Sequence, residues 1–431
     1  MSLALRADER LAGPDPAALA ERFGTPCYVY DLDVIDRQVG ALRTVLPGRA
    51  DIAFALKANP ALAVVTYLGE RGLGADVASG GELATALRAG IAPGSIVMTG
   101  PGKRDDELEA AVRAGIRAIT VESPGELARL ERIAANLARR QPVMLRAAST
   151  DVARHERVRL VGDAGAGKFG MDGADLVRAA RAAASSPHVE LVGLHAFGAS
   201  NVLDADALVD HVAATGRTAA AVARAAGILL AIIDAGGGLG IPYADREAPL
   251  DLEALGRGLA AVLAAWARDP FLAEARLLLE PGRFLVGPAG VYVARVVDTK
   301  IVEGAAVAIL DGGVHHVLRP ALVGQEHRLR VLSSAADGGP RRPVTVAGPL
   351  CSGLDVLARE AMLPPLDVGD LVAVLDVGAY GFTESMPFFL SHPMPAEVIA
   401  RNGEAACIRP RREPVTWLDE QRVPDLVSGT I

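Results

Sequence analysis

One lysine and the apolar run before it are the first candidates for chemistry in this chain. Lysine occurs only at positions 57, 103, 168 and 300, among 44 lysine and arginine residues. Lys57 follows residues 51–56, which predict a buried strand that ends before Pro60 because proline cannot continue a β-ladder. Burial at this strand end is expected to lower the pKa of the amine and to favour a nucleophile that forms Schiff bases. The alternative is a lysine whose ammonium extends from the strand end into water.

Two glycine-containing motifs further along the chain suit a phosphorylated cofactor. Successive N–H groups of the glycine run 236–238 can turn toward one phosphate, although such a run is often only a flexible turn. In the motif 280–283, Arg283 would meet that phosphate and Glu280 would meet a basic ring nitrogen; a simple ion pair between them is the alternative. An amine nucleophile, a phosphate loop and a carboxylate for a ring nitrogen together describe a pyridoxal 5′-phosphate (PLP) site.

Short apolar segments, each expected to be a strand, alternate with amphipathic helical segments and must position these groups. The expected strands are residues 51–56, 73–77, 95–98, 118–121, 142–147, 189–195, 228–234 and 276–280. Eight strand–helix units predict a (β/α)8 barrel of the TIM type; an open, doubly wound sheet with fewer strands is the alternative.

Barrel enzymes place their chemistry at the C-terminal ends of the strands. Those ends carry Lys57, Asp76, Thr99, Glu122, Arg146, His195, Asp234 and Glu280. Ordinary capping of the following helix is the alternative explanation, and we prefer it for Glu122 because Ser123-Pro124 follows it. Capping explains Lys57, Arg146 and Glu280 poorly.

After residue 290 the pattern changes to short β-rich segments between Gly, Pro and Asp turns, which predicts an all-β domain. These segments are residues 291–302, 305–310, 327–332, 343–347 and 371–375. The expected division is a PLP-binding barrel over residues 31–284 and a β-domain over residues 1–30 and 285–431 that completes the active site. Residues 27–30 are expected to pair into the sheet of the β-domain.

Composition excludes several classes of function. The net charge of −8 argues against a nucleic-acid partner. No apolar run approaches the roughly 18 residues of a membrane span, and the charged N-terminal stretch lacks an apolar signal core, so we expect a cytoplasmic protein without a membrane partner. Three cysteines provide neither a disulfide framework nor metal-ligand spacing, and no metal is expected.

Several motifs are also similar to those of one known enzyme family. They are residues 54–60, 76–82, 168–170, 236–238, 280–283, 319–322, 348–351 and 378–381. Through them the chain resembles, over nearly its whole length, the fold-type III PLP-dependent decarboxylases, which include diaminopimelate and ornithine decarboxylases. The resemblance implies an alanine racemase-like barrel plus a β-domain, PLP as the cofactor, and a head-to-tail homodimer with shared active sites.

The resemblance implies roles for individual residues. Lys57 would hold the cofactor, Glu280 would pair with its ring nitrogen, and Arg146 would lie near its phenolic oxygen. Arg319 would reach a substrate carboxylate. Cys351 of the partner subunit would assist reprotonation of Cα, although without the resemblance Cys351 is an ordinary buried thiol. The other implied cofactor-binding residues are Asp76, Ser200, Gly237, Gly238, Gly282, Arg283 and Tyr380.

Three positions depart from the family pattern. The histidine that stacks on the cofactor ring in relatives is Phe197, which can stack but cannot carry charge. Ser352 follows the cysteine where relatives have an acid that binds the distal ammonium of the substrate. Val323 stands where relatives have a tyrosine. The cofactor-binding positions are thus largely kept while positions that would contact the substrate have changed.

The expected activity is PLP-dependent α-decarboxylation of an amino acid or amino-acid derivative in a biosynthetic pathway. A buried ammonium without a carboxylate costs several kcal/mol, so Ser352 argues against a free diamino acid. Together with residues 389–393, the pattern is closest to the branch that acts on carrier-protein-linked amino acids, as in the butirosin pathway.

Four alternatives to this activity remain open. One is a diaminopimelate- or ornithine-type decarboxylase of a free amino acid, in which Asp355 or Glu384 takes over the ammonium contact. The others are an amino-acid racemase, a non-catalytic PLP-binding protein and a barrel enzyme of unrelated chemistry. Racemases of this fold place an arginine at the ring nitrogen, so Glu280 argues against that activity.

Overall fold

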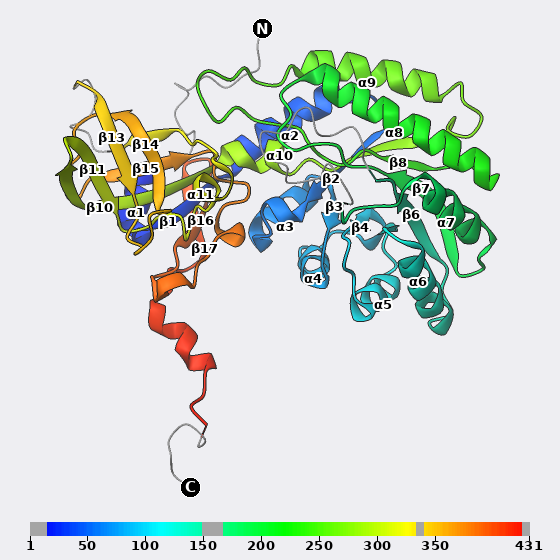
Figure 1. Ribbon diagram of the computed structural model, residues 1–431, viewed down its shortest axis with the longest axis horizontal. Helices are drawn as coiled ribbons and strands as arrows, with labels where there is room; N and C mark the ends of the chain where they lie inside the picture. The colour runs from blue at the N-terminus through cyan, green and yellow to red at the C-terminus, as the bar shows by residue number, and fades with distance from the viewer. Residues whose placement is uncertain (1–14, 149–166, 333–339, 425–431) are drawn as a thin grey trace. The chain divides into compact units, whose positions relative to one another are not determined.

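The computed structural model describes residues 15–148, 167–332 and 340–424. These residues form two compact units. The first, here the barrel unit, contains residues 35–287, and the second, here the β unit, contains residues 15–34 and 288–424. Figure 1 labels the elements of both.

The barrel unit is built on a closed ring of eight parallel strands. They are β2 (Ala50–Ala55), β3 (Gly74–Val77), β4 (Ile96–Met98), β5 (Ala118–Val121), β6 (Gln141–Arg146), β7 (Val189–His195), β8 (Ile232–Asp234) and β9 (Arg276–Leu279). The last strand pairs with the first, with Ala50 opposite Leu277, and this pairing closes the ring. The predicted (β/α)8 barrel is therefore confirmed, and the alternative of an open sheet is wrong.

Helices lie on the outside of the barrel, and α3 to α9 connect its strands (Figure 1). They are α2 (Leu32–Val45), α3 (Leu62–Glu70), α4 (Gly80–Arg88), α5 (Asp105–Ala114), α6 (Pro124–Asn136), α7 (Gly173–Ser185), α8 (Ala205–Ala226), α9 (Leu252–Trp266) and the short α10 (Arg283–Val286). Small buried side chains such as Ala53, Val97 and Ala118 pack in the barrel interior.

Two of the helix starts use the same capping device just after a strand. The Ser79 hydroxyl accepts a hydrogen bond from the Glu82 N–H at 3.2 Å, and Ser123 accepts one from the Glu126 N–H at 3.0 Å. Each glutamate returns to an N–H one residue before its serine, on Ala78 and on Glu122. Because the serines cap these helices, the side chain of Glu122 is left for another role.

The β unit contains α1 (Pro16–Phe23), α11 (Arg319–Val323) and a nine-stranded sheet. Its strands are β1 (Cys27–Asp31), β10 (Gly290–Val302), β11 (Ala305–Leu310), β12 (Leu329–Val331), β13 (Arg342–Ala347), β14 (Val356–Leu363), β15 (Leu371–Leu375), β16 (Ala396–Arg401) and β17 (Glu404–Arg409). The main path runs β14-β13-β11-β10-β1-β16-β17, and β15 pairs with both β10 and β12.

The early strand joins this sheet, as the sequence predicts. β1 lies between β10, to which it is antiparallel, and β16, to which it is parallel. Sequence reasoning missed β14, β16 and β17. Each of these strands mixes apolar residues with two charged ones, and few residues of β14 and β17 are buried, so their apolar pattern is weak.

Candidate active site

Barrel closure places the polar strand-end residues side by side at one end of the ring. In the strand register Asp76 is opposite Ala55, Arg146 is opposite His195, and His195 is opposite Asp234. Glu280 follows directly after β9. Residues far apart in sequence therefore share one surface of the barrel.

Lys57 lies in a short 3-10 turn, Leu56–Ala58, immediately after β2. Its side chain is 42% exposed, and Nζ is 3.2 Å from Asp76 Oδ2. Thr99 donates to the other oxygen of Asp76 at 2.8 Å. The expectation of a desolvated lysine is therefore wrong for this chain, because the amine is reachable from solvent and is held by a buried carboxylate.

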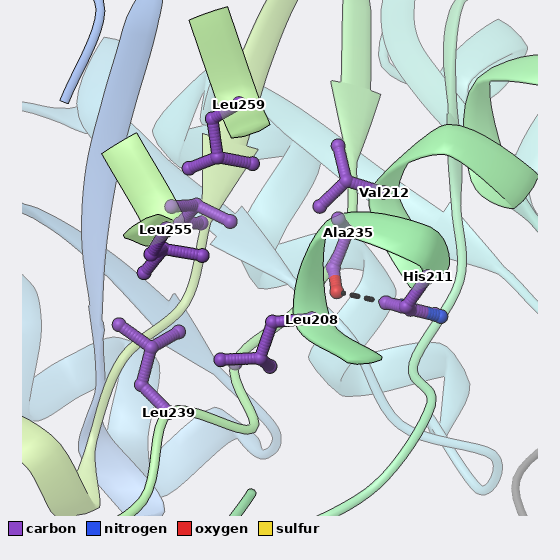
Figure 2. A pocket seen from close by; sticks show the side chains of 9 residues that line it. Leu208, His211, Val212, Ala235, Leu239, Leu255 and Leu259 are labelled. Atoms are coloured by element: carbon purple, nitrogen blue, oxygen red, sulfur yellow. Dashed lines mark hydrogen bonds between the residues drawn. The ribbon is translucent and has the colours of Figure 1, made fainter. Parts of the chain in front are cut away.

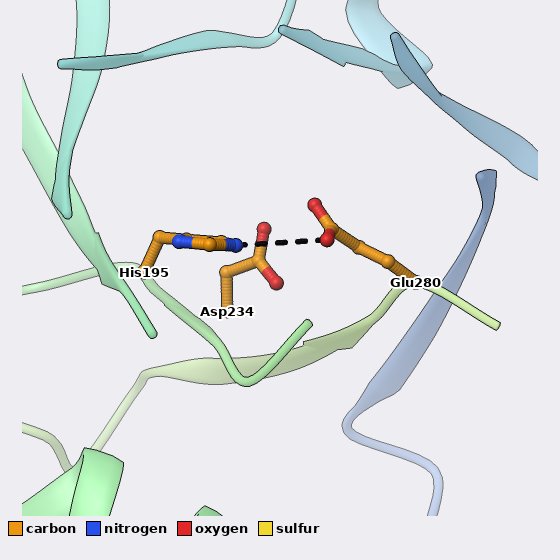
Figure 3. A group of neighbouring side chains, drawn as sticks. All are labelled: His195, Asp234 and Glu280. Atoms are coloured by element: carbon orange, nitrogen blue, oxygen red, sulfur yellow. Dashed lines mark ion pairs between the residues drawn. The ribbon is translucent and has the colours of Figure 1, made fainter. Parts of the chain in front are cut away.

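His195, Asp234 and Glu280 form a buried group next to this pair (Figure 3). Their ligand atoms all lie within 4.8 Å of one another, and His195 Nε2 is 3.6 Å from Glu280 Oε2. Burial raises the pKa of Glu280, but the interaction with His195 and the charge of Lys57 outweigh it and lower that pKa to about 2. Glu280 is therefore the anion of this group at neutral pH.

The neighbouring carboxyl groups behave in the opposite way. Burial and the charge of Glu280 raise the pKa of Asp234 well above its ordinary value. The same two causes raise the pKa of Asp76, with Lys57 and Thr99 opposing the change. The surroundings thus lower the pKa of one carboxyl group of the site, Glu280, and raise the pKa of the other two.

The glycine run after β8 is packed against backbone that leaves no room for side chains. A Cβ on Gly237 would lie 2.4 Å from the Glu280 carbonyl oxygen. Gly238 has a φ of +94°, and its Cβ would lie 2.7 Å from the Ala199 carbonyl oxygen. Glycine is therefore required at both positions by close approach, and at Gly238 also by backbone conformation.

Arg283 lies near this loop and is itself buried. It donates to the Ser200 hydroxyl at 3.3 Å and to the Tyr243 hydroxyl at 2.5 Å. Tyr243 was missed by sequence reasoning; its place shortly after the glycine run was the available signal. Gly282 allows close packing here, because a Cβ would lie 2.7 Å from that of Ala58.

Glu122 does not serve as a helix cap, so that expectation is wrong. Its carboxylate is 2.7 Å from Arg146 Nη1 and also accepts the N–H groups of Gly100 and Gly170, each at 3.1 Å. Arg146 further lies over the Phe169 ring, 4.5 Å from its centroid. Glu122 thus fixes the direction of Arg146 and ties together three loops at the strand ends.

Phe197 follows β7 and packs on the glycine run. A Cβ on Gly236 would lie 2.6 Å from the Phe197 ring, and Lys57 Nζ is 5.9 Å from the ring centroid. The phenyl group therefore packs on the glycine run near the lysine, where it offers a flat apolar face.

Several candidate residues belong to the β unit. Arg319 begins α11, is buried, and makes an ion pair with Glu384 at 3.0 Å. Its guanidinium also lies 4.6 Å from the centroid of the Tyr380 ring. Cys351 is exposed, so the expectation of a buried thiol is wrong. Val323 is half-buried at the end of the same helix.

The sequence also singled out two further positions of the β unit as candidates near the substrate. Ser352 is half-buried, and its hydroxyl accepts the Leu354 N–H at 3.2 Å. Asp355 is buried and accepts the N–H groups of Val314 and Leu350, each at 2.7 Å. Asp355 therefore holds backbone N–H groups. Glu384 is thus the better candidate of the two for binding a substrate ammonium.

A (β/α)8 barrel with a strand-end lysine, a buried carboxylate and a glycine–arginine loop defines the class of fold-type III PLP enzymes. Comparison with known proteins agrees. The family model described as "Pyridoxal-dependent decarboxylase, pyridoxal binding domain" matches residues 32–287.

Two relatives and one solved structure are similar over nearly the whole chain. L-glutamyl-[BtrI acyl-carrier protein] decarboxylase of Niallia circulans is 34% identical, covering 91% of this chain and 92% of that protein. Diaminopimelate decarboxylase of Methanothermobacter thermautotrophicus is 35% identical, covering 96% and 95%. The structure of diaminopimelate decarboxylase from Helicobacter pylori, complexed with L-lysine, has a TM-score of 0.85 and 29% identity, covering 94% and 98%.

The chain belongs to the PLP-dependent decarboxylase family. It is an amino-acid decarboxylase, a carboxy-lyase, and its cofactor is PLP. Among the described residues no helix is both long and apolar enough to cross a membrane.

The residues of the barrel unit fit this cofactor. Glu280 Oε1 is buried without a hydrogen-bond partner in the described structure, and a carboxylate can accept a ring N–H there. Gly237 and Gly238 leave a side-chain-free backbone for a phosphate, and Arg283 is the cation beside it. The exposed amine of Lys57 is available for an aldehyde.

Proposed function

We propose that the protein decarboxylates, at Cα, an aminoacyl group whose remote end carries no ammonium, and foremost a glutamyl or similar group linked to an acyl-carrier protein. The observation that carries this proposal is Ser352, a hydroxyl where an ammonium-binding acid would be expected. The relative from Niallia circulans, which acts on a glutamyl carrier protein, supports it.

The barrel residues then have defined roles. Lys57 holds the cofactor through its amine, and Glu280 stays anionic so that the ring nitrogen keeps its proton. Bound PLP supplies an electron sink for the pair left when the bond from Cα to the carboxylate breaks. Asp76 holds the lysine amine, and Phe197 offers an apolar face beside it.

The polar residues around these groups orient the cofactor. Ser200, Gly237, Gly238 and Arg283 bind its phosphate, with Gly282 allowing the close packing of Arg283. Arg146, held by Glu122, meets its phenolic oxygen.

The β-unit residues support a substrate without a remote ammonium. Arg319 is paired with Glu384, so the charges of both groups are largely compensated within the unit. A thioester or amide carbonyl can accept from Arg319 without separating the pair. Tyr380 packs on the same guanidinium, and Val323 adds an apolar side chain at the end of that helix.

A second candidate is a decarboxylase of a free diamino acid. It is favoured by the diaminopimelate decarboxylase of Methanothermobacter thermautotrophicus, at 35% identity, and by Glu384, whose side chain is partly exposed. In that case Glu384 would leave Arg319 and bind the substrate ammonium.

Carbon dioxide release from several substrates, measured side by side, decides between the two candidates. We expect efficient turnover of a glutamyl-carrier protein and weak or no turnover of meso-diaminopimelate, lysine and ornithine. Glutamate that is not linked to a carrier separates the effect of the tether from that of the side chain. Efficient turnover of a free diamino acid would contradict the proposal, and its loss in Glu384→Gln would establish the second candidate.

A further inference from the structure

Two loops of the barrel unit carry the proposed phosphate-binding groups. The β7 loop, residues 196–202, contains Ser200, and the β8 loop, residues 235–241, contains Gly237 and Gly238. A phosphate that contacts both loops is bound tightly only if their separation is set beforehand, because ordering mobile groups on binding costs affinity.

The far ends of the two loops are joined by backbone. The N–H of Val202 donates to the Gly238 carbonyl and the N–H of Gly240 donates to the Val202 carbonyl, both at 2.9 Å. The Asn201 side chain accepts the Ile241 N–H, also at 2.9 Å. These bonds hold residues 201–202 against the end of the β8 loop.

His211 on α8 holds the near ends of the same loops. Its Nε2 is 3.1 Å from the Ala235 carbonyl oxygen, and Figure 2 draws this hydrogen bond as a dashed line. The ring also lies against the β7 loop, because a Cβ on Gly198 would be only 2.8 Å from Nδ1. One side chain thus contacts both loops on the side of α8.

The surroundings favour a neutral ring in a fixed position. Leucine side chains, among them Leu208, Leu239 and Leu255, line the small pocket beside His211 (Figure 2). Burial lowers the pKa of His211, against the opposing effect of the Ala235 and Ala196 carbonyls. A neutral imidazole contributes a directed N–H and a rigid shape to the loops, and no charge to the phosphate.

We propose that His211 is a positioning residue that holds the β7 and β8 loops at the separation needed to bind the phosphate group of PLP. The proposal rests on the proposed phosphate-binding role of Ser200, Gly237 and Gly238. The new element is that His211, which is not one of the proposed phosphate-binding residues, determines how tightly the phosphate group is bound.

Binding of PLP and of pyridoxal, which lacks the phosphate, to the apoenzyme tests this role. His211→Leu should weaken PLP binding about five- to tenfold, the effect of one lost hydrogen bond. Its affinity for pyridoxal should stay within about twofold of wild type. His211→Gln, whose amide nitrogen can take the place of Nε2, should restore most of the PLP affinity, whereas the shorter His211→Asn should not. His188→Leu, at the opposite end of β7, is the matched control.

The other outcomes contradict either the role of His211 or the phosphate site itself. Unchanged PLP affinity in His211→Leu, or an equal loss for PLP and pyridoxal, would overturn the role of His211. If His211→Leu does not fold, as judged by its melting temperature, equal PLP binding by the Gln and Asn variants would overturn it. A wild-type apoenzyme that binds pyridoxal as tightly as PLP would instead overturn the phosphate site itself, and the proposal with it.

Discussion

At the scale of single residues, the site contains polar side chains that contact one another before any ligand binds. Lys57 faces Asp76, and Glu280 faces His195. Burial and Glu280 raise the pKa of Asp76, whereas His195 and Lys57 lower the pKa of Glu280 against the effect of burial, so neighbouring side chains set the ionisation of both buried carboxyl groups.

The first residue-scale prediction concerns Lys57, the proposed cofactor-binding lysine. Borohydride reduction of the holoenzyme should attach the cofactor to Lys57, because this amine is exposed at the strand ends. Mass spectrometry of peptides locates the label. Lys103 is the internal control, since its amine is buried and 2.7 Å from Glu126. A label on Lys103, Lys168 or Lys300 would show that the site is assigned to the wrong lysine.

The second prediction concerns Asp234, whose pKa is raised by burial and by Glu280. As pH rises above about 4, the pKa of Asp234 in the unfolded chain, this carboxyl group ionises in the unfolded chain while it stays protonated in the folded protein. The group therefore lowers the free energy of unfolding as pH rises toward its pKa in the folded protein. Asp234→Asn removes that cost and keeps an acceptor for the Gly236 N–H. The stability of the variant relative to wild type should therefore increase from pH 4 to pH 8.

Urea unfolding of the apoenzyme at several pH values measures this effect. Asp206→Asn, an exposed position at the start of α8, is the control and should show no such trend. A difference between Asp234→Asn and wild type that does not change with pH would mean that Asp234 is ionised in the folded protein.

At the scale of elements, the loops after the strands are bound to one another as well as to their own helices. Glu122 joins the loop after β4 to Arg146 and to Gly170, and His211 joins the loops after β7 and β8. Each of these connections is made by a side chain outside the proposed set of cofactor-binding residues.

This arrangement predicts a large effect of Glu122→Ala. The change leaves Arg146 buried without its carboxylate and should lower the free energy of unfolding by about 3–5 kcal/mol. Glu190→Ala is a matched control, because Glu190 pairs with Arg140 at 3.7 Å with both side chains about half exposed. The control should change stability by less than about 1 kcal/mol in denaturant unfolding. Similar losses for the two variants would show that Glu122 has no special structural role.

At the scale of the whole molecule, the proposed chemistry draws on residues of both units. Lys57 belongs to the barrel unit, whereas Cys351 is an exposed thiol of the β unit. We propose that the active form is a homodimer in which Cys351 of the partner subunit serves the site that contains Lys57.

Mixing two inactive variants tests this assembly. Lys57→Ala and Cys351→Ala subunits, exchanged at equal amounts, should recover about a quarter of wild-type activity, because half of the dimers are mixed and each has one complete site. Native mass spectrometry verifies that exchange has occurred. Exchange without any recovery would count against shared sites.

The sequence by itself determined the barrel, the strand ends and the candidate lysine. Apolar periodicity and Gly or Pro breaks are local signals, and the C-terminal end of each parallel strand must lie at one end of a barrel. Weakly patterned strands of the β unit, such as β17, escaped this reasoning because their apolar residues do not alternate with polar ones.

Only the tertiary structure decided how the strand-end residues are used. It showed Lys57 exposed and paired with Asp76, and Glu122 turned toward Arg146 instead of its own helix. It also placed His211 against two loops, a contact that no local sequence pattern indicates. These contacts join side chains from different strand–helix units, so their partners and burial depend on ring closure and packing, which no local spacing encodes.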